Sequence, residues 1–181
     1  MKKTIVLFAL AFTGLVSFAQ KKTTTSATVT FDATTEKDAQ PKAENKTAIG
    51  AIDPLSGAVQ FEANVKNFAF SNPMMQGHFN SATWLNSDKF PIFTFNGKIT
   101  NLSEVKFDKN GSYDVKVSGD LAIKGVTKPI TIQGKIIVKD GVFSVSAAFS
   151  VSVADYGISG VPIDAGKVAK EPKITVFATF K

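Results

Sequence analysis

FAFSNPMMQGHFNSATWLNSDKFPIFTF, residues 68–95, is the stretch from which the fold of this chain is predicted. It contains the only Trp and the only His of the chain, and it is rich in Phe. The sequence on both sides alternates apolar and polar residues, as strands do, whereas this stretch does not. We therefore expect an apolar, aromatic segment that covers or lines the mouth of a β-barrel.

A short helix is expected near the start of this stretch, within a lid segment of about residues 72–86. Asn72 is a good helix-capping residue, and Pro73 suits the first helical position. The spacing of the next apolar residues, close to three and four, places them on one helical face. These residues are Met74, Met75, His78 and Phe79.

Alternating apolar residues predict strands on both sides of the lid segment. The predicted strands are residues 27–33, 46–52, 59–65, 93–99, 113–123, 130–138, 143–153 and 174–180. The apolar phase changes at Lys66–Asn67, which predicts a β-bulge. Residues 20–26 are expected to be a loose lead-in, and the polar residues 34–45 an exposed loop. The fold class is therefore all-β, an antiparallel barrel of about eight strands with one short helical lid.

Small residues on the inward faces of these strands bear on whether the barrel is hollow. An eight-stranded barrel is wide enough either to be filled by side chains or to hold one ligand. We interpret the small inward residues as unfilled volume, although they can also lie opposite Phe rings or mark barrel corners. These residues are Ala63, Gly119, Gly134, Ala147 and Ala178.

The N-terminus predicts a cleaved secretory signal peptide over residues 1–19. Lys2 and Lys3 precede a short apolar run, and Ser17 and Ala19 provide the small residues that a signal peptidase reads. An uncleaved anchor is the alternative. The chain has no Cys, which excludes a lipid-modified Cys and any disulfide. We expect residues 20–181 to form a single domain in the periplasm, with an extracellular location left open.

Composition argues against several classes of function. The net charge of +6 is mild for 181 residues, and the Lys residues are not interleaved with aromatic ones as on a nucleic-acid platform. With one His and no Cys, the chain has no metal-binding motif, and no nucleophile motif surrounds a Ser. No catalytic residue, metal or cofactor is predicted. Lys124, Lys128 and Lys167 are ordinary surface residues by default, and one of them near the mouth would suit a phosphate.

Two motifs resemble the YceI family of bacterial periplasmic proteins. They are MMQGHFNSATWLNSDKFPIFTFNGKIT, residues 74–100, and GDLAIKGVTKPI, residues 119–130. The resemblance extends from about residue 58 to residue 181, and the family's usual Ile-Asp-x-x-His-Ser opening is reduced to Ile52–Pro54. It implies an extended lipocalin-like barrel whose internal tunnel holds a polyisoprenoid chain, as in isoprenoid quinones or their pyrophosphate precursors.

The expected function is the binding, transport or sequestration of an apolar lipid of this isoprenoid type in the barrel interior. Met74, Met75 and Phe79 either plug the barrel or form a ligand wall, and Trp84 marks the edge of the site. His78 either ties the helix to the barrel through a hydrogen bond or contacts a ligand head group. The predicted ligand-binding residues are Phe68, Phe70, Met74, Met75, His78, Phe79, Trp84, Leu85, Phe90, Phe93 and Phe95.

Two other classes of function remain open at this point. The first is an enzyme that acts on a buried lipid with His78 as its base. The second is a stress-related interaction module whose barrel is filled and whose partner binds an exposed apolar patch. The sequence predicts no membrane-spanning segment after signal cleavage, and it leaves a homodimer open.

Overall fold

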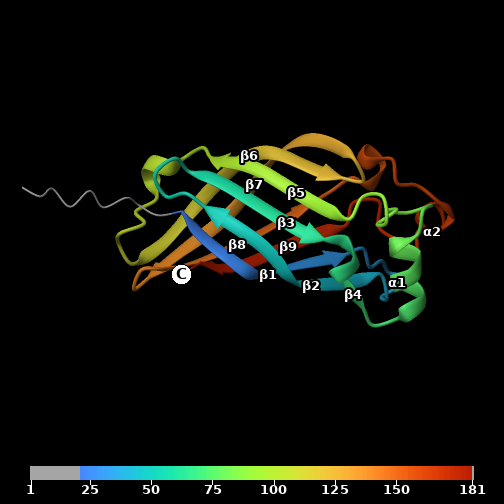
Figure 1. Cartoon of the computed structure of the whole chain (residues 1–181). Coiled ribbons are helices and arrows are strands. Elements are labelled where there is room, and N and C mark those ends of the chain that lie inside the picture. The colour runs from blue at the N-terminus through green and yellow to red at the C-terminus, as the bar shows by residue number, and fades with distance from the viewer. Residues whose placement is uncertain (1–20, 181) are drawn as a thin grey trace, which may run out of the picture.

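Antiparallel strands form an elongated barrel in the computed structural model, which describes residues 21–180 (Figure 1). The predicted signal peptide lies outside these residues. The strands are β1 (Lys22–Asp32), β2 (Lys42–Ile52), β3 (Ala58–Asn64), β4 (Ala69–Phe70), β5 (Ile92–Ile99), β6 (Gly111–Ile123), β7 (Val126–Lys139), β8 (Val142–Ser150) and β9 (Lys173–Phe180).

The strand order closes the sheet on itself. It runs β1-β9-β8-β7-β6-β5-β3-β2, and an additional β1–β2 pairing completes the ring. The short β4 pairs only with β2, outside the ring of eight. Each pairing is antiparallel, and closure leaves the ring without an open edge. The prediction of an eight-stranded antiparallel barrel is confirmed.

The N-terminal strands are longer than predicted. Residues 22–26 are not a loose lead-in, because Thr24 pairs with Gly50 and is only 8% exposed. The predicted loop 34–45 is wrong over its last residues, where β2 begins at Lys42 and Ala43 is 3% exposed. Pairing between β1 and β2 closes the barrel here, and it stabilises the N-terminal ends of these strands, whose own sequence lacks an apolar alternation.

The phase change after β3 is a helical turn rather than the predicted β-bulge. Val65–Asn67 forms one turn of 3₁₀ helix, in which the Asn64 side chain accepts a hydrogen bond from the Lys66 backbone N–H. A capped turn satisfies backbone groups that a bulge would leave unpaired. The chain therefore leaves the barrel wall at this point, with Phe68 buried at 2% exposure.

The predicted helix is present as α1 (Pro73–Asn80), and its cap is the predicted one. The Asn72 side chain accepts a hydrogen bond from the Met74 backbone N–H at 2.9 Å. The rest of the lid segment continues as turns. The other helical elements are α2 (Val161–Asp164) and the 3₁₀ turns Leu102–Glu104 and Val153–Tyr156. Within residues 21–180, no helix has the length and apolar character needed to span a membrane.

The two ends of the barrel differ. At the end opposite α1, aromatic rings fill the interior and form what we call the floor, made of Phe61, Phe143 and Phe180. Phe180 is fully buried, and its ring centroid lies 6.1 Å from that of Phe61. The end covered by α1 and α2 is the mouth (Figure 1). An internal ligand therefore has to enter from the mouth.

The inward glycines do not create free volume, contrary to our expectation. A Cβ atom on Gly119 would overlap the Asn96 carbonyl oxygen and the Gly97 Cα atom on β5. A Cβ on Gly134 would lie 2.9 Å from the Ser146 carbonyl oxygen on β8. Both positions allow neighbouring strands to approach closely.

Candidate functional site

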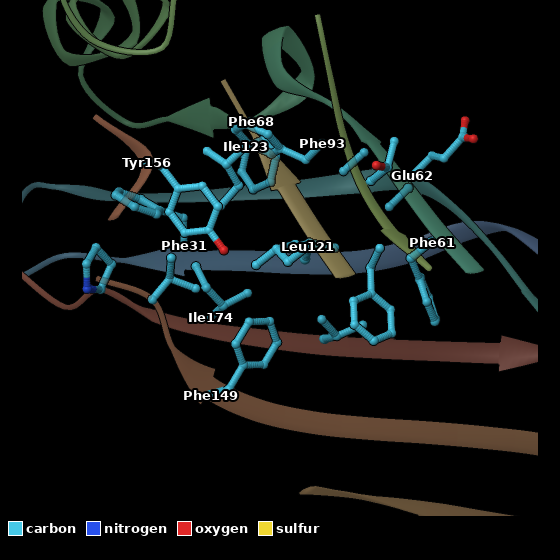
Figure 2. A pocket seen from close by; sticks show the side chains of 18 of the residues that line it. Phe31, Phe61, Glu62, Phe68, Phe93, Leu121, Ile123, Phe149, Tyr156 and Ile174 are labelled. Carbon is cyan, nitrogen blue, oxygen red and sulfur yellow. The ribbon is translucent and has the colours of Figure 1, made fainter. Parts of the chain in front are cut away.

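A cavity of about 170 Å³ lies inside the barrel, between the mouth and the floor. We call it the inner cavity. Apolar side chains from all eight strands of the ring line it, and aromatic rings surround it in Figure 2. An apolar cavity of this size stays dry and accepts apolar guests. Ala63 and Ala147 line it as predicted, whereas Ala178 does not.

Strand register shows how the inner cavity descends from the mouth. On β8 and β9, Phe149 lies opposite Ile174, and one layer deeper Ala147 lies opposite Val176. All four residues line the cavity. The last layer contains Phe180, which closes the floor. The space is therefore a tube with one blind end, a shape that suits an extended apolar chain.

A second cavity, of about 410 Å³, lies outside the first, between α1 and residues 159–168. We call it the outer cavity. Phe31, Phe79 and Trp84 line both cavities, and we call these three residues the neck. The two spaces therefore adjoin at the neck. Together they form a path from the surface into the barrel.

Phe79 holds α1 against the barrel wall at the neck. Its side chain is 6% exposed, and its ring centroid lies 4.9 Å from that of Phe70 and 5.3 Å from that of Phe31. The Phe68 ring centroid is 5.8 Å away. Such tilted and edge-on aromatic pairs contribute about 0.5–1.5 kcal/mol each beyond burial. One helical side chain thus packs against three aromatic rings at the neck.

Nine of the eleven predicted ligand-binding residues line the two cavities. The inner cavity has Phe68, Leu85, Phe93 and Phe95, the outer one has Phe70, Met75 and His78, and Phe79 and Trp84 belong to both. Met74 lies outside both, 72% exposed on α1. Phe90 also lies outside, against the Gly125 turn. Contact of the nine with a ligand stays a prediction.

Gln76, rather than His78, ties α1 to the barrel. The Gln76 Oε1 atom accepts a hydrogen bond from the Phe70 backbone N–H at 3.1 Å. The His78 side chain is exposed, and its imidazole forms no hydrogen bond with the residues that the structure describes. The predicted anchoring role of His78 is therefore wrong. His78 instead lines the outer cavity.

Polar groups are few around the inner cavity. Glu62, Thr94, Trp84 and Tyr156 are its only lining residues with polar side-chain atoms in the described part of the chain. The Glu62 carboxylate points away from the cavity in Figure 2. Tyr156 is 3% exposed, and this burial, with a smaller contribution from Asp155, raises the pKa of its hydroxyl above the ordinary value.

The lysines considered for a phosphate are not in the cavity walls. Neither cavity is lined by a Lys from residues 21–180. The Lys124 Nζ atom donates a hydrogen bond to the Gly157 carbonyl oxygen at 3.1 Å. This contact ties the β6–β7 turn to the connection between β8 and β9. Among the described residues, the titratable side chains in the cavity walls are only Glu62, whose carboxylate points away, Tyr156 and His78.

Several lining residues were not named from the sequence. Phe31, Phe149 and Ile174 occupy inward positions of predicted strands, so the alternating pattern already contained the signal for them. Tyr156 and Ile158 come from the connection between β8 and β9, which has no apolar period. Only their burial in the structure identifies them.

Comparison with known sequences gives a consistent match. Residues 8–180 match the sequence profile of the YceI-like domain. Protein YceI from Escherichia coli O17:K52:H18 is 32% identical over 85 residues, which cover 47% of this chain and 40% of that protein. The match to the curated relatives therefore spans less than half of their length.

Solved structures of low sequence identity share the fold. BcnA from Burkholderia cenocepacia has a TM-score of 0.69 and 18% identity, over 84% of this chain and 95% of that one. A polyisoprenoid binding domain from Saccharophagus degradans has a TM-score of 0.75 and 12% identity, over 89% and 97%. At these identities the similarity concerns the fold alone.

Proposed function

The chain belongs to the YceI-like domain family, and from that premise we propose that it binds an apolar lipid inside the barrel. The observation that carries the proposal is the blind apolar tube that begins at the neck and ends at the floor. We propose that the bound lipid is an isoprenoid chain, and that the protein carries or sequesters it in the periplasm. The signal-like N-terminus supports that location.

Burial alone provides the driving force for such binding. Each CH₂ group that moves from water into an apolar site contributes about 0.8 kcal/mol. Ten such groups contribute about 8 kcal/mol before the costs of association. The tube needs no acid, base or metal for this purpose. A molecule that is insoluble in water thereby becomes mobile in an aqueous compartment.

A wall with both large and small side chains supports an isoprenoid chain, rather than a straight acyl chain, as the proposed ligand. The repeated methyl branches of an isoprenoid chain need such a wall, because each branch widens the chain locally. On β8 and β9 the inner cavity has the large Phe149 and Ile174 in one layer and the smaller Ala147 and Val176 in the next. The solved fold relative from Saccharophagus degradans is described as a polyisoprenoid binding domain, which supports the same ligand class.

Native mass spectrometry of freshly purified protein tests whether a lipid is present. We expect an added mass that disappears on unfolding, and an extract that contains a lipid with isoprene-type branching. An extract that contains only straight-chain acyl lipids contradicts the isoprenoid assignment. A protein that carries no lipid and takes up none from an added mixture contradicts the binding function itself.

A matched pair of substitutions tests the position of the site. Ala147 lines the inner cavity, whereas the next residue, Ala148, is exposed on the outer face of β8. The A147F side chain takes the place of part of the ligand, whereas A148F adds the same ring outside. Loss of contact with two CH₂ groups costs about 1.6 kcal/mol, or about 15-fold in affinity.

The single Trp provides the readout for this pair, because Trp84 lies at the neck and lines both cavities. Titration of the delipidated protein with a prenyl lipid should change Trp84 fluorescence. We expect A147F to weaken binding by about 15-fold or more, and A148F to leave it unchanged. Equal affinities of the two variants contradict binding inside the barrel.

A further inference from the structure

Two segments without a charged residue surround the outer cavity. Asp, Glu, Lys and Arg make up 20% of the chain, yet residues 67–87 and 156–163 contain none of them. The first segment lines the outer cavity through α1 and the turns after it, and the second lines it through α2. We call the two segments together the rim. Figure 1 shows α1 and α2 at the same end of the barrel, so uncharged surface is concentrated where the ligand path opens.

The rim also carries the two most exposed large apolar side chains of residues 21–180. Val161 on α2 is 79% exposed, and Met74 on α1 is 72% exposed. A surface helix usually presents charged or polar residues to the solvent. The solvent-exposed residues of α1 are instead Pro73, Met74, Gly77 and His78. Apolar exposure concentrated around an opening is typical of a surface that binds another apolar body.

The connection between β1 and β2, residues 33–41, holds both sides of the rim. On one side, the Asn72 Nδ2 atom, at the start of α1, donates a hydrogen bond to the Gln40 Oε1 atom at 2.9 Å. On the other side, the Lys37 Nζ atom donates to the Ala165 carbonyl oxygen, directly after α2, at 3.0 Å. The two helices that carry the exposed apolar side chains are therefore tied to one part of the barrel.

Charges of both signs surround the rim in equal number. The connections at this end of the barrel, residues 33–41, 65–91, 124–125 and 151–172, contain six Lys and six acidic residues. Lys66 and Asp88, which bracket the first segment of the rim, form an ion pair of 2.6 Å with each other. Attraction of this end to an anionic surface is therefore weak, and the rim suits an electrically neutral apolar layer.

We propose that the rim docks the mouth of the barrel on a phospholipid bilayer, with Met74 and Val161 inserted at the level of the head groups. In the docked state the outer cavity opens into the bilayer, and an apolar chain passes between bilayer and barrel without crossing water. The inference goes beyond the proposed function, because it assigns a surface and a partner. It rests on that function only for the identity of the molecule that is transferred.

Two observations favour a bilayer over a protein partner. The rim surrounds the outer cavity, which adjoins the apolar inner cavity at the neck, so the exposed apolar surface continues into the lipid path. The rim also lacks the Asp, Glu, Lys and Arg residues with which protein interfaces select a partner by charge. In addition, Trp84 at the neck belongs to a residue type that is enriched at membrane surfaces.

Co-sedimentation with phosphatidylcholine vesicles tests the docking surface. The variants are Met74→Asp and Val161→Asp, which place a charge on each side of the rim. An Asp at position 74 lies in the first turn of α1, where a carboxylate favours the helix, so this variant should fold. The matched control is Leu55→Asp, because Leu55 is 69% exposed and lies between β2 and β3 at the opposite end of the barrel.

We expect wild type to sediment with the vesicles, and Met74→Asp and Val161→Asp each to lower its partition by about tenfold, the effect of losing part of one apolar side chain's burial. Leu55→Asp should partition as wild type does. Because the charges around the rim balance, added salt should change the partition by less than about twofold. Melting temperatures and titration with a prenyl lipid in solution check that all three variants are folded and still bind.

Transfer kinetics test whether docking serves the lipid. The protein is loaded with dansyl-labelled farnesol and mixed with phosphatidylcholine vesicles that contain a quencher. If the lipid moves in the docked state, the transfer rate rises in proportion to the vesicle concentration. Met74→Asp and Val161→Asp should lower this rate by about tenfold, in line with their partition, whereas Leu55→Asp should leave it unchanged.

Other results overturn the inference. If wild type stays in the supernatant, or if Leu55→Asp lowers the partition as much as Met74→Asp does, the rim is not a docking surface. A transfer rate that does not depend on the vesicle concentration shows that the lipid leaves through water. In these cases the binding function stands as long as the prenyl lipid binds in solution. A wild type that sediments with vesicles but binds no prenyl lipid retains the docking surface and contradicts the proposed function.

Discussion

Gly119 provides a sharp test of how the barrel wall is built. The residue pairs with Gly97 across β5 and β6, and a Cβ atom at position 119 would overlap the Asn96 carbonyl oxygen and the Gly97 Cα atom. Both obstacles are backbone atoms, so no side-chain rotation relieves the overlap. Gly119→Ala must push β5 and β6 apart locally, which strains the hydrogen bonds between the two strands.

The size of the effect follows from the kind of contact. Overpacking in a well-packed site costs about 1–3 kcal/mol, and a backbone obstacle places Gly119→Ala at the upper end. For a chain of this size, each kcal/mol lowers the melting temperature by about 2–4 °C, so we expect a decrease of about 6–12 °C. Gly134→Ala should cost less, since its Cβ would lie 2.9 Å from one carbonyl oxygen.

Gly77 is the matched control, because a Cβ there meets no atom within 4 Å and the residue lies inside α1. Gly77→Ala should stabilise the protein by about 0.5–1 kcal/mol. Thermal unfolding followed by circular dichroism ranks the three variants. If Gly119→Ala is as stable as wild type but binds lipid more weakly, Gly119 contributes cavity volume, and our account of the strand contact is wrong.

Three further predictions concern the neck and the mouth. Asp32 has a lowered pKa, chiefly because the Thr34 hydroxyl donates to it at 2.7 Å and further because of Lys42. The stabilisation that comes from the ionised Asp32 carboxylate is present above pH 4 and is lost as the pH falls through the lowered pKa. In urea unfolding, the free energy of unfolding of wild type should therefore exceed that of Asp32→Asn at pH 7 and not at pH 2. Phe79→Ala opens the neck and should lower stability by about 3–5 kcal/mol and speed ligand release in stopped-flow experiments. Met74→Ser alters an exposed residue outside both cavities and should leave lipid affinity within about twofold in titrations.

The sequence predicted the C-terminal half of the barrel closely because its signals are local. β6, β7 and β8 alternate apolar and polar residues, and tight turns join them. Lys124 and Asp140 each have φ 51°, and Gly125 and Gly141 follow with φ 78° and 80°. Two successive positive φ values are typical of the two-residue hairpin turn, and Asp-Gly is one of its commonest sequences. Turn and alternation together fix which residues face inward.

The N-terminal half was predicted less well because its strands depend on distant partners. Asn45 is fully buried in β2, where a polar residue argues against an inward position. Its side chain donates to the Asn64 carbonyl oxygen at 2.9 Å and accepts from the Thr47 backbone N–H at 2.8 Å. The buried amide is therefore satisfied, which no pattern within residues 42–52 reveals.

Some residues of the candidate site were likewise predicted from the sequence, and others were not. Phe79 and Trp84 were predicted at the mouth because aromatic residues concentrate in one non-strand stretch, and the structure places both at the neck. Tyr156 was not predicted, since the apolar residues within 154–172 follow no regular period. Its position depends on how the connection folds back over the barrel end, which tertiary packing decides.

The inward small residues show why cavity volume is hard to infer from sequence. In the sequence, Gly119 and Ala147 both appear as small residues within an apolar alternation. In the structure, Gly119 lies against the backbone of β5, whereas Ala147 lines the inner cavity. Glycine permits two strands to touch, whereas alanine keeps its Cβ between the strand and the lumen. Volume remains where the walls stay apart and the rings of the floor and neck close the ends. The extent of the cavity is thus set by the large side chains that bound it, Phe180 and Phe79, rather than by the positions of the small residues.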